Sequence, residues 1–329
     1  MSVVVAVDGG NSKTHVARVR DDGTVLGVVR GPGSSPHGLG VEGSLDVLQA
    51  LIDEAGGHGD LAVLLLAAID FPDEEAVYHA GAAARGWAPR TIVGNDTFAV
   101  LRAGSERGWG VAVTCGAGIN CVGVAPDGRR VRFPSLGEIS GDWGGGQDVG
   151  LAALWAAARS EDGRGPRTSL ERLVPSYFGI DTPAGLARAL HSGRVVQRRL
   201  AELAPVTFAA ADSDPVAGAI VDRLAAEVVA MAQAALTRLD LTREAADVVL
   251  GGGLLQSGNA RLLDGIEAGL SRVNPALAVH VSSSPPVVGS ALVGLDELGA
   301  GPEARARLRV ELGAAVAGLA KPEAVPLGH

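Results

Sequence analysis

The sequence has few of the residues on which several classes of protein depend. Aromatic residues make up 3 % of the 329 residues, and the only lysines are Lys13 and Lys321. The 28 basic residues are outnumbered by 37 acidic ones, which gives a net charge of −9. Such a chain lacks the positive charge that attracts nucleic acids and anionic membranes, and the aromatic surface on which bases stack. We therefore expect no nucleic-acid partner and no membrane partner.

Cysteine and long hydrophobic runs are equally scarce. The two cysteines, Cys115 and Cys121, are separated by five residues, which matches no zinc-ligand spacing and gives no disulfide framework. The longest apolar run, residues 61–69, is about half as long as a membrane span. The N-terminus leads directly into an apolar segment over residues 3–7, without a basic region or a cleavage site. We therefore expect a soluble, cytoplasmic protein.

Glycine, by contrast, is abundant. The chain has 47 glycines, roughly 14 % of its residues against the ~7 % of an average soluble protein. Hydrophobic residues make up 47 % and charged residues 20 %. A chain of this composition can bury a substantial core, and its length allows two domains.

The order of the predicted elements indicates a duplicated α/β unit. The first copy has strands over 3–7, 15–20 and 24–30, a helix over 41–55, a strand over 61–67, a helix over 73–85 and a strand over 91–93. The second copy has strands over 111–114, 120–124 and 129–133, a long helical stretch from about 147, a strand over 248–250, a helix near 257–271 and a strand over 277–281.

These elements predict the division of the chain into domains. The N-terminal domain is expected over 1–108 and a larger C-terminal domain over 109–300. The C-terminal domain carries a helical insertion at about 150–240, of which 160–215 consists either of several short helices or of partly mobile chain. A C-terminal helix and tail occupy 301–329.

Three glycine-rich loops follow predicted strands, at 8–14, 114–120 and 250–257. A glycine turn brings backbone N–H groups close to phosphate oxygens, and a lysine and hydroxyl groups in the first loop add charge and further donors. Asp8, at the end of the first strand, is well placed to hold Mg²⁺. The alternatives are an ordinary glycine hairpin for the first loop and close strand-to-helix packing for the third.

Asp96 follows the strand over 91–93, where a helix begins. A carboxylate at this position can accept a proton from a hydroxyl group that attacks a phosphate. It can equally be the N-cap of the helix, a role that aspartate favours. The residues alone leave both roles open.

Five segments together resemble the BadF/BadG/BcrA/BcrD-type ATPase family, and within it the N-acetylglucosamine kinase branch. They are DGGNSKT at 8–14, GNDTFA at 94–99, CGAGIN at 115–120, GEISGDWGGG at 137–146 and LGGGLLQSG at 250–258. The resemblance extends over about residues 3–300. It implies an α/β protein with the actin-like ATPase (sugar kinase) fold, in which two ribonuclease-H-like domains hold ATP and substrate in a central cleft.

The resemblance also implies roles for individual residues, with ATP and Mg²⁺ as cofactors. Asp96 is the catalytic base and Asp8 the metal anchor. The substrate contacts are expected to be Ser35, His37, Asn95, Asp96, Asn120, Glu138 and Asp142. The nucleotide contacts are expected to be Gly9, Gly10, Asn11, Ser12, Lys13, Thr14, Gly116, Ala117, Gly118, Gly251, Gly252, Gly253 and Ser257.

Some of these positions keep an alternative interpretation. Ser35 or Pro36 stands where related kinases have a sugar-binding asparagine, and His37 can be an ordinary loop histidine. Glu138 can be a surface residue. Trp143 is a departure, since related kinases often have Gly-Asp-Glu-Gly at this motif, and it can stack on a sugar or cover a helix end.

The sequence therefore predicts an ATP-dependent sugar kinase that phosphorylates the 6-hydroxyl of an amino sugar, with N-acetylglucosamine as the first candidate. A kinase for glucosamine or a muramic acid derivative is an alternative. So is an ATP-hydrolysing activator or regulatory protein of the same family, because Gly-Gly-Gln-Asp at 145–148 resembles a motif of radical-dehydratase activators. Neither cysteine is placed to bind the iron–sulfur cluster of such activators, so we treat this string as coincidence. Relatives commonly form homodimers, and the sequence leaves the oligomeric state open.

Overall fold

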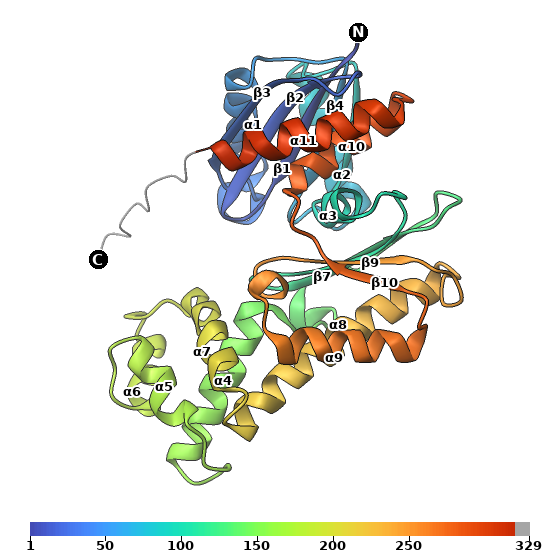
Figure 1. The fold of residues 1–329 in the computed structure, drawn as a ribbon. Helices are drawn as coiled ribbons and strands as arrows, with labels where there is room; N and C mark the ends of the chain where they lie inside the picture. The colour runs from blue at the N-terminus through green and yellow to red at the C-terminus, as the bar shows by residue number, and fades with distance from the viewer. Residues whose placement is uncertain (320–329) are drawn as a thin grey trace. The chain divides into compact units, whose positions relative to one another are not determined.

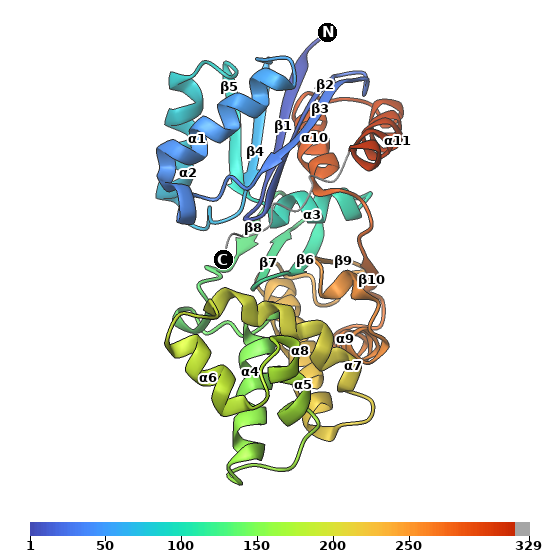
Figure 2. The same ribbon diagram turned by 90° about the vertical axis from the view of Figure 1, so that its left-hand side faces the viewer.

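The computed structural model describes residues 1–319, and this part of the chain forms two compact units. Unit 1 consists of Met1–Glu106 together with the segment that begins at Ser284, and unit 2 is Arg107–Ser283. Each unit is built on one five-stranded mixed sheet with helices packed against it (Figures 1 and 2). The expected tail beyond residue 319 lies outside the described residues.

The strands and helices of unit 1 come from both ends of the chain. Its strands are β1 (Val3–Gly9), β2 (Lys13–Arg20), β3 (Val25–Pro32), β4 (Leu61–Leu66) and β5 (Arg90–Asn95). Its helices are α1 (Pro36–Glu54), α2 (Pro72–Ala84), α3 (Thr97–Gly104), α10 (Pro286–Glu297) and α11 (Pro302–Gly318).

The sheet of unit 1 has the strand order β3-β2-β1-β4-β5. β2 runs antiparallel to β1 and β3, whereas β1, β4 and β5 are parallel. In the register, Gly9 lies opposite Leu66, and Leu66 lies opposite Asn95. The carboxyl ends of the three parallel strands therefore meet at one edge of the sheet, where ligands bind in open α/β sheets.

Helices cover both faces of this sheet (Figure 2). Val5 and Val7 of β1 belong to a core with α1 and α2, while Val4 and Ala6 belong to a second core with α10 and α11. Because successive residues of a strand point to opposite faces, a strand that is buried on both faces is apolar throughout. This explains the continuous apolar runs of β1 and β4.

Unit 2 contains the strands β6 (Gly110–Cys115), β7 (Ile119–Val124), β8 (Arg130–Arg132), β9 (Asp247–Gly251) and β10 (Ala278–Val281). Its longer helices are α4 (Gly145–Glu161), α5 (Leu170–Tyr177), α6 (Pro183–His191), α7 (Ala204–Ala210), α8 (Pro215–Arg238) and α9 (Ala260–Val273). Short 3-10 turns are η1 (Gly137–Ile139), η2 (Gln197–Leu203) and η3 (Leu255–Ser257).

The sheet of unit 2 repeats the topology of unit 1. Its strand order is β8-β7-β6-β9-β10, with β7 antiparallel to β6 and β8, and with β6, β9 and β10 parallel. The duplicated α/β unit that the sequence predicts is thus confirmed. In the expected insertion, the segment 160–215 consists of short helices, the first of the two alternatives.

In the structure, unit 1 ends at Glu106 and resumes at Ser284, whereas the predicted domain boundaries are at residues 108 and 300. α10 was not expected, and it precedes residue 300 but packs on the sheet of unit 1 through residues such as Val287 and Leu292. A boundary at 300 therefore separates this helix from the strands that it covers. Among residues 1–319, no helix combines the length and the apolar character that a membrane crossing requires.

Candidate functional site

Three carboxylates gather at the edge of unit 1 where the parallel strands end. Asp8 lies in β1, Asp96 follows β5, and Asp70 lies in the loop after β4. Burial, helped by the negative charges of Asp8 and Asp70, raises the pKa of Asp96 to about 7. A partly buried carboxyl that titrates near neutral pH is suited to accept a proton from a substrate.

Asp96 occupies the N-cap position of α3, but among the described residues its side chain makes no capping hydrogen bond. Asn95 takes over that task, because its Oδ1 accepts a hydrogen bond of 2.9 Å from the backbone N–H of Thr97. The Asn95 Nδ2 donates to Asp70 Oδ1 at 2.8 Å, which fixes the orientation of the amide. The role of Asp96 as a catalytic base stays a prediction.

Two further residues lie at this edge, Asn95 and Asp70. Asn95, expected to contact substrate, is only 2 % exposed and uses its amide within the protein. Asp70 was not predicted, although its place just after the buried strand β4 is a signal of the kind that singled out Asp8. Ala68, two residues before Asp70, has a φ of 62°, a left-handed conformation that costs energy for a residue with a Cβ and that clusters at ligand sites.

Asp8 is 8 % exposed and faces His15 across the β1–β2 pair. His15 Nδ1 lies 3.7 Å from Asp8 Oδ2 and has no hydrogen-bond partner among residues 1–319. Within the part of the chain that the structure describes, no three metal-ligating side chains, those of Asp8, Asp70 and Asp96 included, are arranged so that they could together hold a metal ion. One or two carboxylates at such an edge still fit Mg²⁺, which proteins commonly hold together with phosphate oxygens.

The first glycine loop is a tight turn between β1 and β2. The Gly10 N–H donates to the Lys13 carbonyl at 2.9 Å, and the side chains of Asn11, Ser12 and Lys13 are exposed. Thr14 differs from them, because it is buried and its hydroxyl donates to Ser34 Oγ at 2.8 Å. The loop therefore presents three side chains and backbone to solvent, while Thr14 holds it to the next segment.

That next segment carries the expected substrate residues Ser35 and His37. The Ser34 N–H donates to the Gly10 carbonyl at 3.1 Å, so the segment packs on the first loop. Ser35 is only 8 % exposed, and its hydroxyl has no hydrogen-bond partner within the described chain. Buried polar groups are rarely left unpaired, so this hydroxyl has capacity for a ligand. His37 is exposed.

Three predicted segments come together within unit 2. In the second loop, the Gly116 N–H donates to the Gly118 carbonyl at 2.9 Å. The start of α4 binds this loop, because the Gly146 N–H donates to the Gly116 carbonyl at 2.8 Å. The third loop joins them through the Leu254 N–H, which donates to the Cys115 carbonyl at 3.0 Å. One contiguous surface of glycine-rich backbone results.

The glycines of this surface fall into two groups. Glycine is required by packing at Gly252, where φ is 86° and a Cβ would lie 2.5 Å from the Cys115 carbonyl oxygen. At Gly145 a Cβ would collide with Gly118 Cα. At Gly116, Gly118 and Gly253, by contrast, a Cβ would meet no heavy atom of the described residues within 4 Å. The fold does not need glycine at these three positions, which suits the close approach of a phosphate or a nucleotide.

The expected sugar contacts of unit 2 lie around the same surface. The Asp142 carboxylate accepts a hydrogen bond from Ser140 Oγ and is partly buried. Asn120 Oδ1 accepts from the N–H of Cys121 at 2.7 Å, whereas Glu138 is exposed. Ser257, the expected nucleotide contact, is exposed in η3 and donates to the Leu254 carbonyl at 2.6 Å.

The side chains of Trp143 and of the two cysteines pack against other residues of unit 2. The guanidinium of Arg223 lies 3.9 Å from the centre of the Trp143 ring, so one face of the ring is covered. Both cysteines are fully buried, and burial raises the pKa of the Cys115 thiol to about 12 and that of Cys121 further. Buried thiols of this kind are inert, in agreement with their interpretation as core residues.

Comparisons with known proteins bear on the whole chain. The family model of the BadF/BadG/BcrA/BcrD ATPase family matches residues 5–294. A curated relative, the N-acetylmuramic acid/N-acetylglucosamine kinase of Clostridium acetobutylicum, is 29 % identical over 270 residues, which are 79 % of this chain and 87 % of the relative.

Solved structures show the same architecture. A Chromobacterium violaceum protein provisionally assigned as an N-acetylglucosamine kinase has a TM-score of 0.68 and 25 % identity, and the match covers 89 % of this chain and 99 % of that one. A ROK family glucokinase from Streptomyces griseus, solved with glucose and AMPPNP, has a TM-score of 0.57 and 18 % identity, covering 90 % and 98 %.

The fold expected from the sequence, that of the actin-like sugar kinases, is thus confirmed by the two duplicated sheets and by these structures. The five motifs that suggested a family lie within the matched residues 5–294. The chain belongs to the BadF/BadG/BcrA/BcrD ATPase family.

Proposed function

We propose that this chain is an ATP-dependent amino-sugar kinase that converts N-acetylglucosamine to N-acetylglucosamine 6-phosphate. The observation that carries the proposal is Asp96, a carboxyl at the edge of the parallel strands that does no capping and whose pKa is raised to about 7. The name of the Clostridium relative and membership in an ATPase family support the substrate and the phosphoryl donor.

In this mechanism Asp96 is the general base. It accepts the proton of the 6-hydroxyl while that oxygen forms a bond to the γ-phosphorus of ATP. The bond between this phosphorus and the β–γ bridging oxygen breaks, and ADP leaves with the electron pair. Base assistance of this kind contributes about 10²- to 10⁴-fold to the rate. Positioning and charge neutralisation account for the remainder of the rate enhancement in phosphoryl transfer.

The glycine-rich loops bind the nucleotide in this proposal. The N–H groups of Gly10 and Gly116 bond within their own turns, so the phosphate contacts are assigned to other backbone groups of residues 9–14 and 116–118. Residues 251–253 with Ser257 contact the nucleoside. The room beside Gly116, Gly118 and Gly253 supports this assignment. Mg²⁺, which neutralises phosphate charge when bound, is assigned to Asp8.

The sugar contacts in this proposal are Ser35, Asn120 and Asp142, with His37 and Glu138 near the edge of the site. The unpaired hydroxyl of Ser35 supports its inclusion. Asn95 acts indirectly, because its amide holds Asp70 and the start of α3. Since the enzyme uses ATP, we assign it to the cytoplasm.

The test is the release of ADP in the presence of N-acetylglucosamine, glucosamine, N-acetylmannosamine and N-acetylmuramic acid. We expect turnover that depends on the sugar and on the Asp96 carboxyl, so that Asp96→Asn loses at least 100-fold in kcat. Asp127→Asn, in the exposed turn between β7 and β8, is the matched control and is expected to keep the wild-type rate. ATP hydrolysis that ignores all sugars, or an active Asp96→Asn variant, would contradict the proposal.

A further inference from the structure

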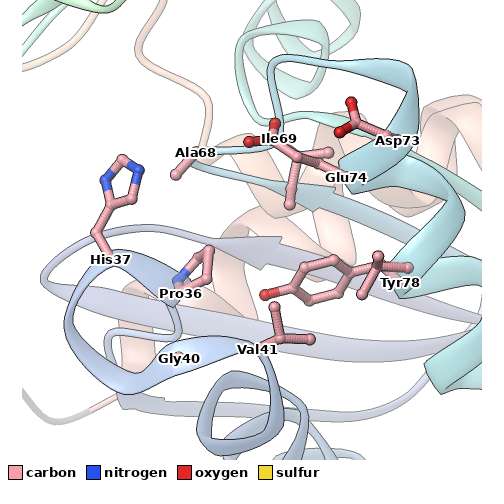
Figure 3. A pocket seen from close by; sticks show the side chains of 10 residues that line it. Pro36, His37, Gly40, Val41, Ala68, Ile69, Asp73, Glu74 and Tyr78 are labelled. Carbon is pink, nitrogen blue, oxygen red and sulfur yellow. The ribbon is translucent and has the colours of Figure 1, made fainter.

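A pocket of about 320 Å³ lies within unit 1, between the start of α1, the loop after β4 and the first turns of α2. Most of its wall is apolar and comes from Pro36, Val41, Ala68, Ile69, Val77 and Tyr78. Figure 3 shows Pro36, Val41 and the ring of Tyr78 close together, with His37 to one side. The volume is at the lower end of the range for small-molecule pockets, ~300–1,000 Å³.

The pocket borders the residues that we assign to the sugar. Pro36 directly follows Ser35, and Ile69 directly precedes Asp70. The Asp70 carboxylate accepts a hydrogen bond from Asn95, the neighbour of Asp96. Chain neighbours of Ser35 and of the carboxylate cluster thus form part of the pocket wall, and His37, which we assign to the edge of the sugar site, lines it too. The inference below rests on the proposed function for this reason.

The wall leaves apolar surface uncovered. Val41 is 37 % exposed and Val77 is 45 % exposed, although both are valines of helices that pack on the core. The polar end of Tyr78 is already satisfied, because its hydroxyl donates to Ser44 Oγ at 2.6 Å. What the wall offers a ligand is thus mainly hydrophobic contact, which is typical of pockets that bind apolar groups.

Two acidic residues give the pocket a negative charge. Asp73 and Glu74 line it, and none of its described lining residues is an arginine or a lysine. The Glu74 carboxylate accepts hydrogen bonds from the N–H groups of Asp70 and Phe71, at 2.7 and 2.9 Å. These two bonds hold the Glu74 carboxylate beside the pocket, where its negative charge and that of Asp73 repel a second anion.

We propose that this pocket receives a neutral, apolar substituent of the amino sugar that is larger than an acetyl group. An acidic substituent, such as the lactyl ether of muramic acid, is excluded by Asp73 and Glu74. Two sources share the required chemistry, namely a longer acyl chain on the 2-amino nitrogen and an apolar group linked to the anomeric carbon.

The first experiment measures kcat/KM for the N-acetyl, N-propanoyl, N-butanoyl and N-hexanoyl derivatives of glucosamine. A buried methylene is worth about three- to fivefold, so we expect kcat/KM to rise by this factor per methylene until the pocket is full. The phenyl β-glycoside of N-acetylglucosamine tests the anomeric source. N-Acetylmuramic acid is expected to be at least tenfold poorer than N-acetylglucosamine.

Variants test whether this pocket is responsible. Val77→Phe and Val41→Phe narrow it from α2 and from α1, and each is expected to abolish the rise with chain length. Val310→Phe, at an exposed position of α11, is the matched control, and in this variant kcat/KM should still rise with acyl chain length. Asp73→Lys is expected to raise kcat/KM for N-acetylmuramic acid at least tenfold, whereas Glu303→Lys, an equal charge change at an exposed position, should not.

The outcomes separate the two proposals. If no amino sugar is phosphorylated, the proposed function fails. The pocket assignment is overturned if the wild type phosphorylates N-acetylglucosamine but has no higher kcat/KM for the longer acyl derivatives or for the glycoside. It is also overturned if the higher kcat/KM persists in both phenylalanine variants. A wild type that prefers N-acetylmuramic acid overturns the charge argument.

Discussion

Asp96 combines two properties that oppose each other. Its surroundings favour the neutral carboxyl, since burial and the charges of Asp8 and Asp70 raise its pKa to about 7. Catalysis as a base requires the ionised form. The same environment that makes Asp96 a useful base therefore makes its ionisation costly for the folded protein, and both consequences can be measured.

The first consequence concerns stability. The pKa of Asp96 is raised above its unfolded value, so its contribution to the free energy of unfolding is greatest at low pH and is lost as the pH rises towards about 7. At about 1.4 kcal/mol for each pKa unit, we expect Asp96→Asn to be about 2–4 kcal/mol more stable than the wild type at pH 8, and less than half of that at pH 5.

Urea unfolding at both pH values checks this expectation. Asp127→Asn is the control, because the pKa of Asp127 is lowered by its hydrogen bonds with Arg129 and gives no gain on neutralisation. A gain in Asp96→Asn that does not change with pH would contradict the argument.

The second consequence concerns the pH dependence of activity. Because only the ionised carboxylate accepts the proton, kcat/KM is expected to fall about tenfold for each pH unit below about 7. The measurement is a pH profile of ADP release between pH 5 and 9 with saturating ATP. A rate that stays constant down to pH 5 would show that no group with this pKa takes part.

Asn95 is expected to act on Asp96 through position. Its amide links Asp70 to the first turn of α3, so Asn95→Ala removes both bonds. We expect a loss of about 1–2 kcal/mol in stability, as for other caps, and a fall in kcat larger than the change in KM. Thr182→Ala, which removes the cap of α6 at Gly185, should cost similar stability without affecting kcat.

At the scale of elements, the strands were predictable because their signals are local. Turns such as Asp-Asp-Gly and buried apolar runs identify β1, β2 and β4 from the sequence. Which strands lie side by side is not a local property. The order β1-β4-β5 brings Asp70 next to Asp96, and a single strand end, such as that of β4, carries no signal in the sequence for the strand beside it.

α10, unlike these strands, has no local signal in the sequence. Its residues 287–292, 294 and 295 are all buried, including Ser290 and two glycines, so most of the helix has no polar face turned to solvent. Two glycines lower its intrinsic helix propensity further. They are needed by packing, since a Cβ at Gly289 would collide with Ala99 and one at Gly294 with Val4. The sequence of such a helix depends on the elements that pack around it, so the helix cannot be predicted from its own residues alone.

The glycine loops give a prediction at this scale. Gly253→Ala places a methyl group in open space, so we expect normal stability and at least tenfold weaker ATP binding. Gly252→Ala places it against the Cys115 backbone in a left-handed conformation, so we expect a loss of stability as well. Gly163→Ala, in a left-handed turn with open space, is the control for backbone strain alone.

Thermal unfolding and calorimetric titration with an ATP analogue distinguish these effects. If Gly253→Ala binds ATP as the wild type does, the third loop does not approach the nucleotide closely. If all three variants lose ATP affinity equally, the effect is one of general destabilisation.

At the scale of the whole chain, unit 1 is assembled from two distant segments. The chain leaves it after Glu106 and returns at Ser284. The returning α10 meets α3 through a partly buried ion pair, in which Arg102 Nε donates to Asp296 Oδ2 at 2.6 Å and Nη2 donates to Oδ1 at 3.2 Å. This contact spans 194 residues of sequence.

Asp296→Asn therefore tests how far unit 1 depends on its last segment. The variant removes the charge opposite Arg102, whose side chain is only 8 % exposed. Because Asp296 is 35 % exposed and also pairs with Arg305 at 2.9 Å, we expect a cost between the roughly 1 kcal/mol of an exposed pair and the ~3 kcal/mol of a fully buried one. The matched control is Asp222→Asn in unit 2, which loses a pair with Arg261 of similar geometry but greater exposure and should cost less than about 1 kcal/mol. Urea unfolding measures the loss in the free energy of unfolding for both variants. Equal losses would mean that the burial of Arg102 contributes nothing to holding α10 on unit 1.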